Sequence, residues 1–268
     1  MLRPVVLSVV VSCVAFAPAA EAAKARATYT TSLLGFTVAT SELDLTVIDG
    51  AYTLDLGVRT AGLARVFTGF SGTARVAGRL TADRAMPSRF TVDARAGDDH
   101  YDIELGFTGS DVTSRRALPP HDPHPDLIPI DARASRNVTD PLSAFLAPMP
   151  RGDMRRVCER RLPIFTGRDR FDLQLAFARM ETIRLDGVRP SEAIVCSARY
   201  IPIQGHRTER DEPRYMSENR DLFAWFVPIA GSDLLALYRV RVGTRIGAVV
   251  VQLDTLEGDG IPVTRRRR

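Results

Sequence analysis

The chain has 268 residues, of which 45% are hydrophobic and 25% are charged. This composition is that of an ordinary globular protein and excludes a disordered, collagen-like or coiled-coil chain. The net charge of +4 equals the contribution of the four terminal arginines, so the basic residues are not clustered through the fold as in a nucleic-acid-binding domain. We therefore expect no nucleic-acid partner.

The first 22 residues have the pattern of a secretory signal peptide. Arg3 is followed by the apolar run Val5–Phe16, and Ala20–Ala22 fits the small-x-small cleavage pattern, so we expect cleavage after Ala22. The run is short for a membrane-spanning helix, which needs about 20 apolar residues. A retained anchor and a lipidated Cys13 are the alternatives. The mature chain is expected to be exported and to be soluble or peripheral to a membrane.

Residues 26–116 alternate between apolar and polar side chains with a period of two. The runs over 43–47, 52–58 and 101–107 each have one apolar and one polar face, as in an antiparallel sheet with one solvated side. Asp49–Gly50 lies between two such runs and predicts a hairpin turn. This segment is predicted to be an N-terminal meander of strands.

Five prolines between residues 117 and 131 predict a stiff, extended connector to the C-terminal half, which covers residues 140–257. His121, Asp122 and His124 lie in this connector and are residue types that bind metals. Because the prolines hold the segment extended and no other histidine is near in sequence, we expect a solvated loop and no metal.

Few segments favour a helix. Asp140 followed by Pro141 predicts a capped helix over Leu142–Leu146 that ends before Pro148. The polar segment 208–220 predicts a loop or a short helix, and residues 62–70 fit a bent strand or a helix.

Alternation returns over 171–177 and 249–253 in the C-terminal half. The fold class is therefore predicted as mainly β: one curved antiparallel sheet or half-barrel of about ten to twelve strands, with one or two short helices. Residues 23–257 are expected to form one domain, with the connector and the helix on the concave side, because either half alone would leave exposed sheet edges. Residues 258–268 are predicted to be a basic disordered tail. Its arginines, Arg265, Arg266, Arg267 and Arg268, could make peripheral contact with an anionic membrane surface.

Removal of the signal peptide leaves two cysteines, Cys158 and Cys196. An even pair in an oxidising compartment predicts a disulfide, with two buried thiols or a redox pair as alternatives. The chain has no Cys-x-x-Cys spacing, which disfavours the redox pair.

No catalytic constellation is present in the sequence: it has no Gly-x-Ser-x-Gly motif and no free exported thiol. We expect no catalytic residue, no cofactor and no enzymatic activity. Arg168 and Arg170 flank a predicted turn at Gly167 in phase with Asp172. They are interpreted as surface arginines that brace a hairpin, with contact to anionic lipid headgroups as the alternative.

Several motifs of the C-terminal half occur together. They comprise Asp140–Ala144, the run Ile164–Leu173, Cys196, Tyr200, Pro202–Ile203 and Gly205. Together they resemble the bacterial envelope family called domain of unknown function 3108, with Thr166 in place of the usual Asp of the turn. The resemblance implies an exported, β-rich periplasmic protein, similar in fold to the half-barrel of periplasmic lipoprotein carriers, and it implies no catalytic residue.

Three functional hypotheses follow. The first is a periplasmic, envelope-associated protein that binds a lipid, another hydrophobic ligand or an envelope protein. The second is a structural or interaction module with a filled core, and the third is an unrecognised enzyme. A cavity larger than about 300 Å³ lined by aliphatic side chains would favour the first hypothesis. Convergent polar groups with perturbed pKa values would favour the third.

Overall fold

The computed structural model describes residues 23–62, 69–121, 123–183, 185–186, 191–229, 232–259 and 261–266. The predicted signal peptide, Cys13 and most of the ambiguous segment 62–70 lie outside the described residues. Within them the strands are β1 (Ala23–Leu33), β2 (Phe36–Ile48), β3 (Ala51–Thr60), β4 (Ser71–Leu80), β5 (Ala85–Ala96), β6 (Asp99–Thr108), β7 (Asp111–Leu118), β8 (Ala147–Pro148), β9 (Arg161–Phe165), β10 (Arg170–Ile183), β11 (Leu185–Asp186), β12 (Ser191–Gln204), β13 (Leu222–Pro228), β14 (Leu234–Thr244), β15 (Gly247–Gly258) and β16 (Ile261–Arg266). The helices are α2 (Pro141–Phe145), the short 3-10 helix η1 (Met154–Cys158) and α3 (Asp211–Glu218).

All these strands belong to one antiparallel sheet, which confirms the predicted fold class. The main path through the sheet runs β7-β6-β5-β4-β3-β2-β1-β15-β14-β13-β12-β10-β9. The pairing of β1 with β15 joins the N-terminal meander to the C-terminal half. The sheet has 16 strands among the described residues, more than the ten to twelve predicted. The additional strands include β8 and β11, which are only two residues long and carry no alternation pattern, and β16, which lies in the segment predicted to be a tail.

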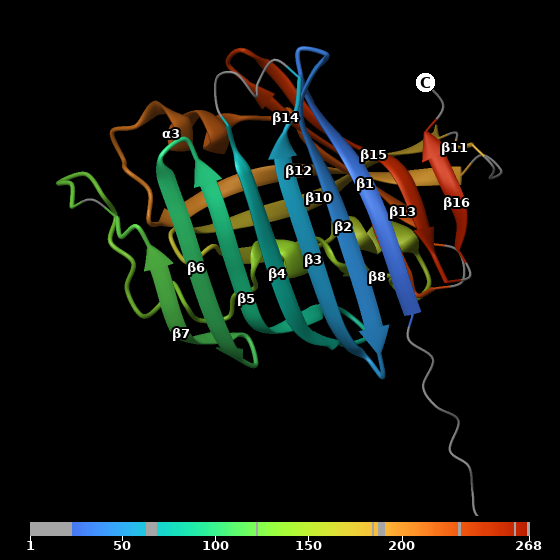
Figure 1. The fold of residues 1–268 in the computed structure, drawn as a ribbon, viewed down its shortest axis with the longest axis horizontal. Coiled ribbons are helices and arrows are strands. Elements are labelled where there is room, and N and C mark those ends of the chain that lie inside the picture. The colour runs from blue at the N-terminus through green and yellow to red at the C-terminus, as the bar shows by residue number, and fades with distance from the viewer. Residues whose placement is uncertain are drawn as a thin grey trace, which may run out of the picture.

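The sheet curls on itself, so that β1–β7 form one layer and β10 and β12 cross behind it (Figure 1). It is not closed, since β7 and β9 are its two ends. Residues 135–139 run between these ends. The N–H groups of Val112 and Val138 bond to the carbonyls of Ser135 and Ser110, each at 2.8 Å, and Phe165 N–H bonds to Thr139 O at 2.9 Å. An irregular segment therefore completes the wall that the strands leave open.

The concave side is filled in part by α2, as the sequence predicts. Asp140 caps this helix, because its Oδ1 accepts the N–H groups of Leu142 at 2.9 Å and Ser143 at 3.0 Å. Ser143 is buried and its hydroxyl lies 2.6 Å from the Tyr52 hydroxyl of β3. The cap and this hydrogen bond fix α2 against the inner face of the meander.

Two turns show how local sequence sets the ends of strands. Asp49 and Gly50, between β2 and β3, both have positive φ, 49° and 74°, as the predicted hairpin turn requires. The polar segment 208–220 contains α3, so the helical alternative is confirmed there.

The prediction of a disordered tail over 258–268 is wrong for Ile261–Arg266, which form β16. β14 pairs with β15 only over residues 247–252, so the last six residues of β15 have no partner from β14 on that edge. β16 covers this edge through the pairs Thr255↔Arg265 and Gly258↔Ile261. Arg267 and Arg268 lie outside the described residues.

Candidate functional site

An apolar cavity of about 330 Å³ lies on the concave side of the sheet, between β1–β3, α2 and β14. We call it the inner cavity. Its lining is mostly aliphatic and includes Ala25, Ala27, Tyr29, Leu43, Leu45, Leu54, Leu56 and Val58 from β1–β3, Pro141–Leu142 and Phe145–Leu146 from the α2 segment, and Ile229, Leu235, Leu237, Val251 and Leu256 from the C-terminal half.

The inner cavity is left open because small side chains on β1 face β3 and α2 without filling the space between them. β1 presents the small side chains Ala25 and Ala27, whereas β3 presents Leu54, Leu56 and Val58 in the alternation that the sequence predicts. Leu56 and Val58 are only half-buried although they face the interior of the fold. Aliphatic side chains that remain partly accessible inside a curved sheet are the pattern of a cavity wall rather than of a filled core.

The inner cavity offers little polar chemistry. None of the described residues that line it carries a charge. The Tyr29 hydroxyl donates a hydrogen bond to Leu237 O at 3.0 Å, and burial raises the pKa of this phenol, so the group stays protonated at neutral pH. Such a lining can hold a hydrocarbon group, and its residues include no acid or base poised to act on it.

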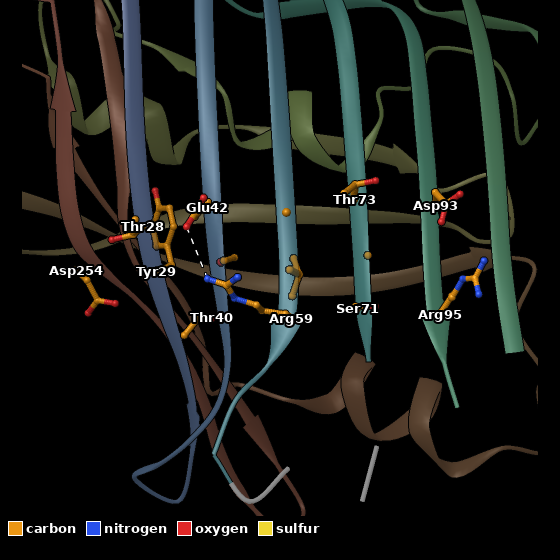
Figure 2. Close-up of a pocket in the computed structure, with 14 residues that line it drawn as sticks. Thr28, Tyr29, Thr40, Glu42, Arg59, Ser71, Thr73, Asp93, Arg95 and Asp254 are labelled. Atoms are coloured by element: carbon orange, nitrogen blue, oxygen red, sulfur yellow. Dashed lines mark ion pairs between the residues drawn. The ribbon is translucent and has the colours of Figure 1, made fainter. Parts of the chain in front are cut away.

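A second hollow, of about 570 Å³, lies on the polar face of β1–β5 (Figure 2). Figure 2 shows Arg59 reaching toward Glu42, and these side chains are 3.8 Å apart and more than half exposed, at 67% and 58%. Neighbouring positions of this face carry further exposed ion pairs, such as Arg75–Asp55 at 2.6 Å. This hollow is a solvated trough of the outer face, where each ion pair contributes at most about 1 kcal/mol to stability.

The two cysteines that the sequence pairs are at bonding distance in the structure. The sulfur atoms of Cys158 and Cys196 are 1.94 Å apart, and both residues are fully buried. The link joins η1 to β12. It therefore fixes the segment that follows α2 to the back layer of the sheet.

The predicted surface position is wrong for Arg170. Its side chain is buried, where Nη1 donates hydrogen bonds to Asp172 Oδ1 and, at 2.6 Å, to Phe171 O. Arg161 pairs with the other oxygen of Asp172. The two-residue spacing places Arg170 and Asp172 on one face of β10, and that face is the buried one. Arg170 is consequently not available to bind a lipid headgroup.

Arg168 is half-buried and binds the connector instead of bracing the hairpin alone. Its Nη1 donates a hydrogen bond to Pro119 O, and its guanidinium lies 5.9 Å from the centre of the Tyr101 ring. The carbonyl of Arg168 is in turn 2.7 Å from His121 Nε2. The turn at Gly167 is thus a docking point for the proline-rich segment.

Thr166 stabilises the turn between β9 and β10 through its hydroxyl. Its Oγ1 accepts the N–H groups of Arg168 at 3.1 Å and Asp169 at 2.8 Å, as a turn-forming side chain does. Gly205 packs directly on the same turn: a Cβ there would lie 2.1 Å from Arg168 O. Thr166, Arg168 and Gly205 therefore belong to one tightly packed region around the turn between β9 and β10.

The comparison with protein families agrees with this geometry. The family described as "Protein of unknown function (DUF3108)" matches residues 25–254. The chain belongs to the DUF3108 family. No curated protein matches it. A crystal structure titled as a beta-barrel-like protein of domain of unknown function DUF1849, from Brucella abortus, is similar to this DUF3108 chain with a TM-score of 0.54 and 6% identity, covering 90% of this chain and 100% of that one. At this identity the similarity shows the fold alone.

Three histidines of this DUF3108 chain, His100, His121 and His124, have polar partners within the protein. His124 pairs with Asp126 through Nδ1 and lies 2.7 Å from Arg207 through Nε2, while Asp122 lies outside the described residues. His100, near the start of β6, lies 3.4 Å from Asp93 of β5. Across the described ranges, no group of three or more His, Cys, Asp or Glu side chains is placed to hold a metal ion. No helix in the described part of the chain is long and apolar enough to cross a membrane.

Sequence reasoning named no residue of the inner cavity as a site. The alternation identified Leu43, Leu54 and Leu56 as inward-facing, but it cannot distinguish a wall from a filled core. The available signal was the contrast between small residues on β1 and large ones on β3, together with the position of the capped helix.

Proposed function

We propose that this protein binds one hydrophobic ligand, the acyl chain of a lipid or of a lipid-modified protein, in the inner cavity. The observation that carries the proposal is the cavity itself: about 330 Å³ of space with an aliphatic lining on the concave side of the sheet. Ligand cavities in proteins span about 300–1,000 Å³ and are lined mostly by apolar side chains. The inner cavity falls at the lower end of that range and suits part of one chain.

An acyl chain fits this lining better than a polar metabolite does. The described lining residues carry no charge that would orient a polar ligand. Each methylene that leaves water contributes about 0.8 kcal/mol, which corresponds to roughly a fourfold gain in affinity. Affinity for a series of fatty acids is therefore expected to rise with each added carbon until the cavity is full, and then to level off.

Binding, rather than catalysis, is the function that we propose. Two buried carboxylates have structural roles: Asp140 caps α2 through Oδ1, and Asp172 pairs with Arg170 and Arg161. Neither residue lines the inner cavity.

We further propose that the chain works in the periplasm after removal of residues 1–22. Support comes from the signal-peptide pattern and from the cysteine pair at bonding distance, since disulfides persist in oxidising compartments. N-terminal sequencing of exported protein is expected to begin near Ala23, and a chain that still begins at Met1 would contradict export with cleavage.

Native mass spectrometry of protein purified from periplasm, followed by lipid extraction, tests the binding proposal. The expected result is an added mass of one lipid or fatty acid, which organic extraction releases. A ligand-free mass, combined with no uptake of fatty acids of any chain length, would favour the module with a filled core.

A further inference from the structure

Three large apolar side chains project from one end of the molecule. Leu34, in the turn between β1 and β2, is 64% exposed, and Phe36, the first residue of β2, is 72% exposed. Ile246, in the turn between β14 and β15, is 68% exposed. Both turns lie at the same end of the fold (Figure 1). They also touch, because the space that a Cβ on Gly247 would occupy is already taken by Leu34 Cδ2, 2.2 Å away. We call Leu34, Phe36 and Ile246 the apolar tip.

Leu34 is unfavourable at its position for two reasons. Its φ is 53°, and Gly35 follows at 84°, so the turn requires the left-handed conformation that Asn, Asp and Gly adopt most easily. The second reason is that the side chain of Leu34 is largely exposed to water. The next hairpin supplies an internal comparison: Asp49 and Gly50 have φ values of 49° and 74°, and there the first residue is the expected aspartate.

We infer that the apolar tip inserts into the surface of a lipid bilayer. A strained and exposed leucine is explained when its side chain is buried on binding, whereas contacts within the fold leave it mostly in water. This inference goes beyond the proposed function and does not require the inner cavity to be filled.

The shape of the tip favours a bilayer over a protein partner. A stable protein interface buries about 800 Å² on each side, and three side chains on two narrow turns cannot supply that area. Tyr215 and Arg245 lie beside the tip, with the guanidinium 5.4 Å from the ring centre. Amphipathic side chains of this kind suit the boundary between headgroups and hydrocarbon.

The tip also lies at the end of the strands toward which the inner cavity extends. Thr31, Ser41 and Val58 line the cavity at this end, since Ser41 pairs with Val58 and Thr31 lies two residues before the end of β1. A bilayer bound at the tip would therefore face this end of the cavity.

Vesicle co-sedimentation of the full mature chain tests the inference. We compare the wild type with Leu34→Asp/Phe36→Ser on vesicles of phosphatidylcholine and of phosphatidylcholine with phosphatidylglycerol, at low and high salt. The double variant is expected to lower partitioning by about tenfold or more in both salts, because burial of apolar side chains drives it. The change at Leu34 restores the residue type of the Asp49–Gly50 turn, so the melting temperature is expected to stay the same or rise.

Matched controls separate the tip from other causes. Ile48→Ser removes a 44% exposed side chain beside the turn between β2 and β3, at the opposite end of β2, and is expected to partition like the wild type. Deletion of Arg267 and Arg268, which follow β16 in the sequence, tests the terminal charge, whose contribution would disappear in high salt. Phe36→Ser alone leaves the turn residues untouched and repeats the test if the double variant does not fold.

Equal sedimentation of the wild type and the tip variants would overturn the inference. So would an equal loss in Ile48→Ser, or binding that disappears on deletion of Arg267 and Arg268 alone. The cavity proposal stands or fails separately, because the tip variants are expected to take up fatty acid in detergent-free solution as the wild type does.

Discussion

Arg170 donates a hydrogen bond from Nη1 to Oδ1 of Asp172, two residues along β10, and both side chains are buried. Residues two apart on a strand share a face, so the spacing alone predicts that these two can meet. Arg161, from β9, reaches the second oxygen of Asp172, and its own side chain is 60% exposed. The buried carboxylate of Asp172 is thus shared between a buried arginine and one that extends to the surface.

Asp172→Asn is expected to lower the free energy of unfolding by about 3–5 kcal/mol, because the change leaves a buried guanidinium without its counter-charge. The matched control is Asp55→Asn, which breaks an exposed pair with Arg75 and is expected to cost no more than about 1 kcal/mol. Urea denaturation measures both variants. Equal losses in the free energy of unfolding for the two variants would show that the buried guanidinium of Arg170 does not need the charge of Asp172.

The disulfide is expected to stabilise the fold by roughly 4 kcal/mol, since it closes a loop with a sequence separation of 38 residues. The double variant Cys158→Ala/Cys196→Ala should therefore unfold at a markedly lower temperature than the oxidised wild type. Reductant should lower the melting temperature of the wild type and leave that of the variant unchanged. If reductant has no effect on the wild type, the cysteines are not bonded.

Asp140 is expected to make the stability depend on pH with the sign opposite to that of a salt-bridged aspartate. Burial raises its pKa, and hydrogen bonds from Ser143 oppose this rise only in part. A raised pKa in the folded state means that the folded protein binds the proton more tightly. The contribution of Asp140 is then largest below the ordinary aspartate pKa and is lost as the pH rises through the raised value.

Asp140→Asn keeps an oxygen to cap α2 and carries no charge, so it should remove this pH dependence and be at least as stable as the wild type at pH 7. Asp153, which caps η1, is the comparison. Hydrogen bonding from Arg155 lowers the Asp153 pKa, so its contribution is present above the ordinary aspartate pKa and is lost as the pH falls. Denaturation of Asp140→Asn and Asp153→Asn at a series of pH values distinguishes the two effects, and parallel curves for Asp140→Asn and the wild type would refute the assignment.

Gly205→Ala is expected to destabilise the hairpin beyond the cost of backbone conformation. Gly205 has a φ of 87°, and its Cβ would lie 2.1 Å from Arg168 O. Gly35 has nearly the same φ, 84°, but a Cβ there would meet nothing within 4 Å. Gly35→Ala should cost about 1–2 kcal/mol from conformation alone, and Gly205→Ala clearly more. Melting curves of the two variants with the same loss would exclude the packing argument.

Much of the fold follows from local patterns in the sequence, and the candidate site does not. The alternation in β2 and β3, the Asp49–Gly50 turn and the cap at Asp140 each depend on neighbours in sequence, and the structure has them as predicted. The burial of Arg170 and the pairing of β16 with β15 depend on strands far along the chain. The inner cavity depends on the distance between β3 and α2, which no local pattern encodes.

The most direct measurement of the central claim is a titration with a fluorescent polyene fatty acid, using the wild type, Leu56→Trp and Thr53→Trp. Leu56 lines the inner cavity, whereas Thr53 alternates to the opposite face of β3, so both variants add the same bulk to one strand. Melting temperatures of both variants check that they fold. We expect saturable binding of one fatty acid by the wild type and by Thr53→Trp, and a loss of about tenfold or more in Leu56→Trp. Equal binding by all three proteins, or none by the wild type, would contradict the assignment of the inner cavity as a ligand site.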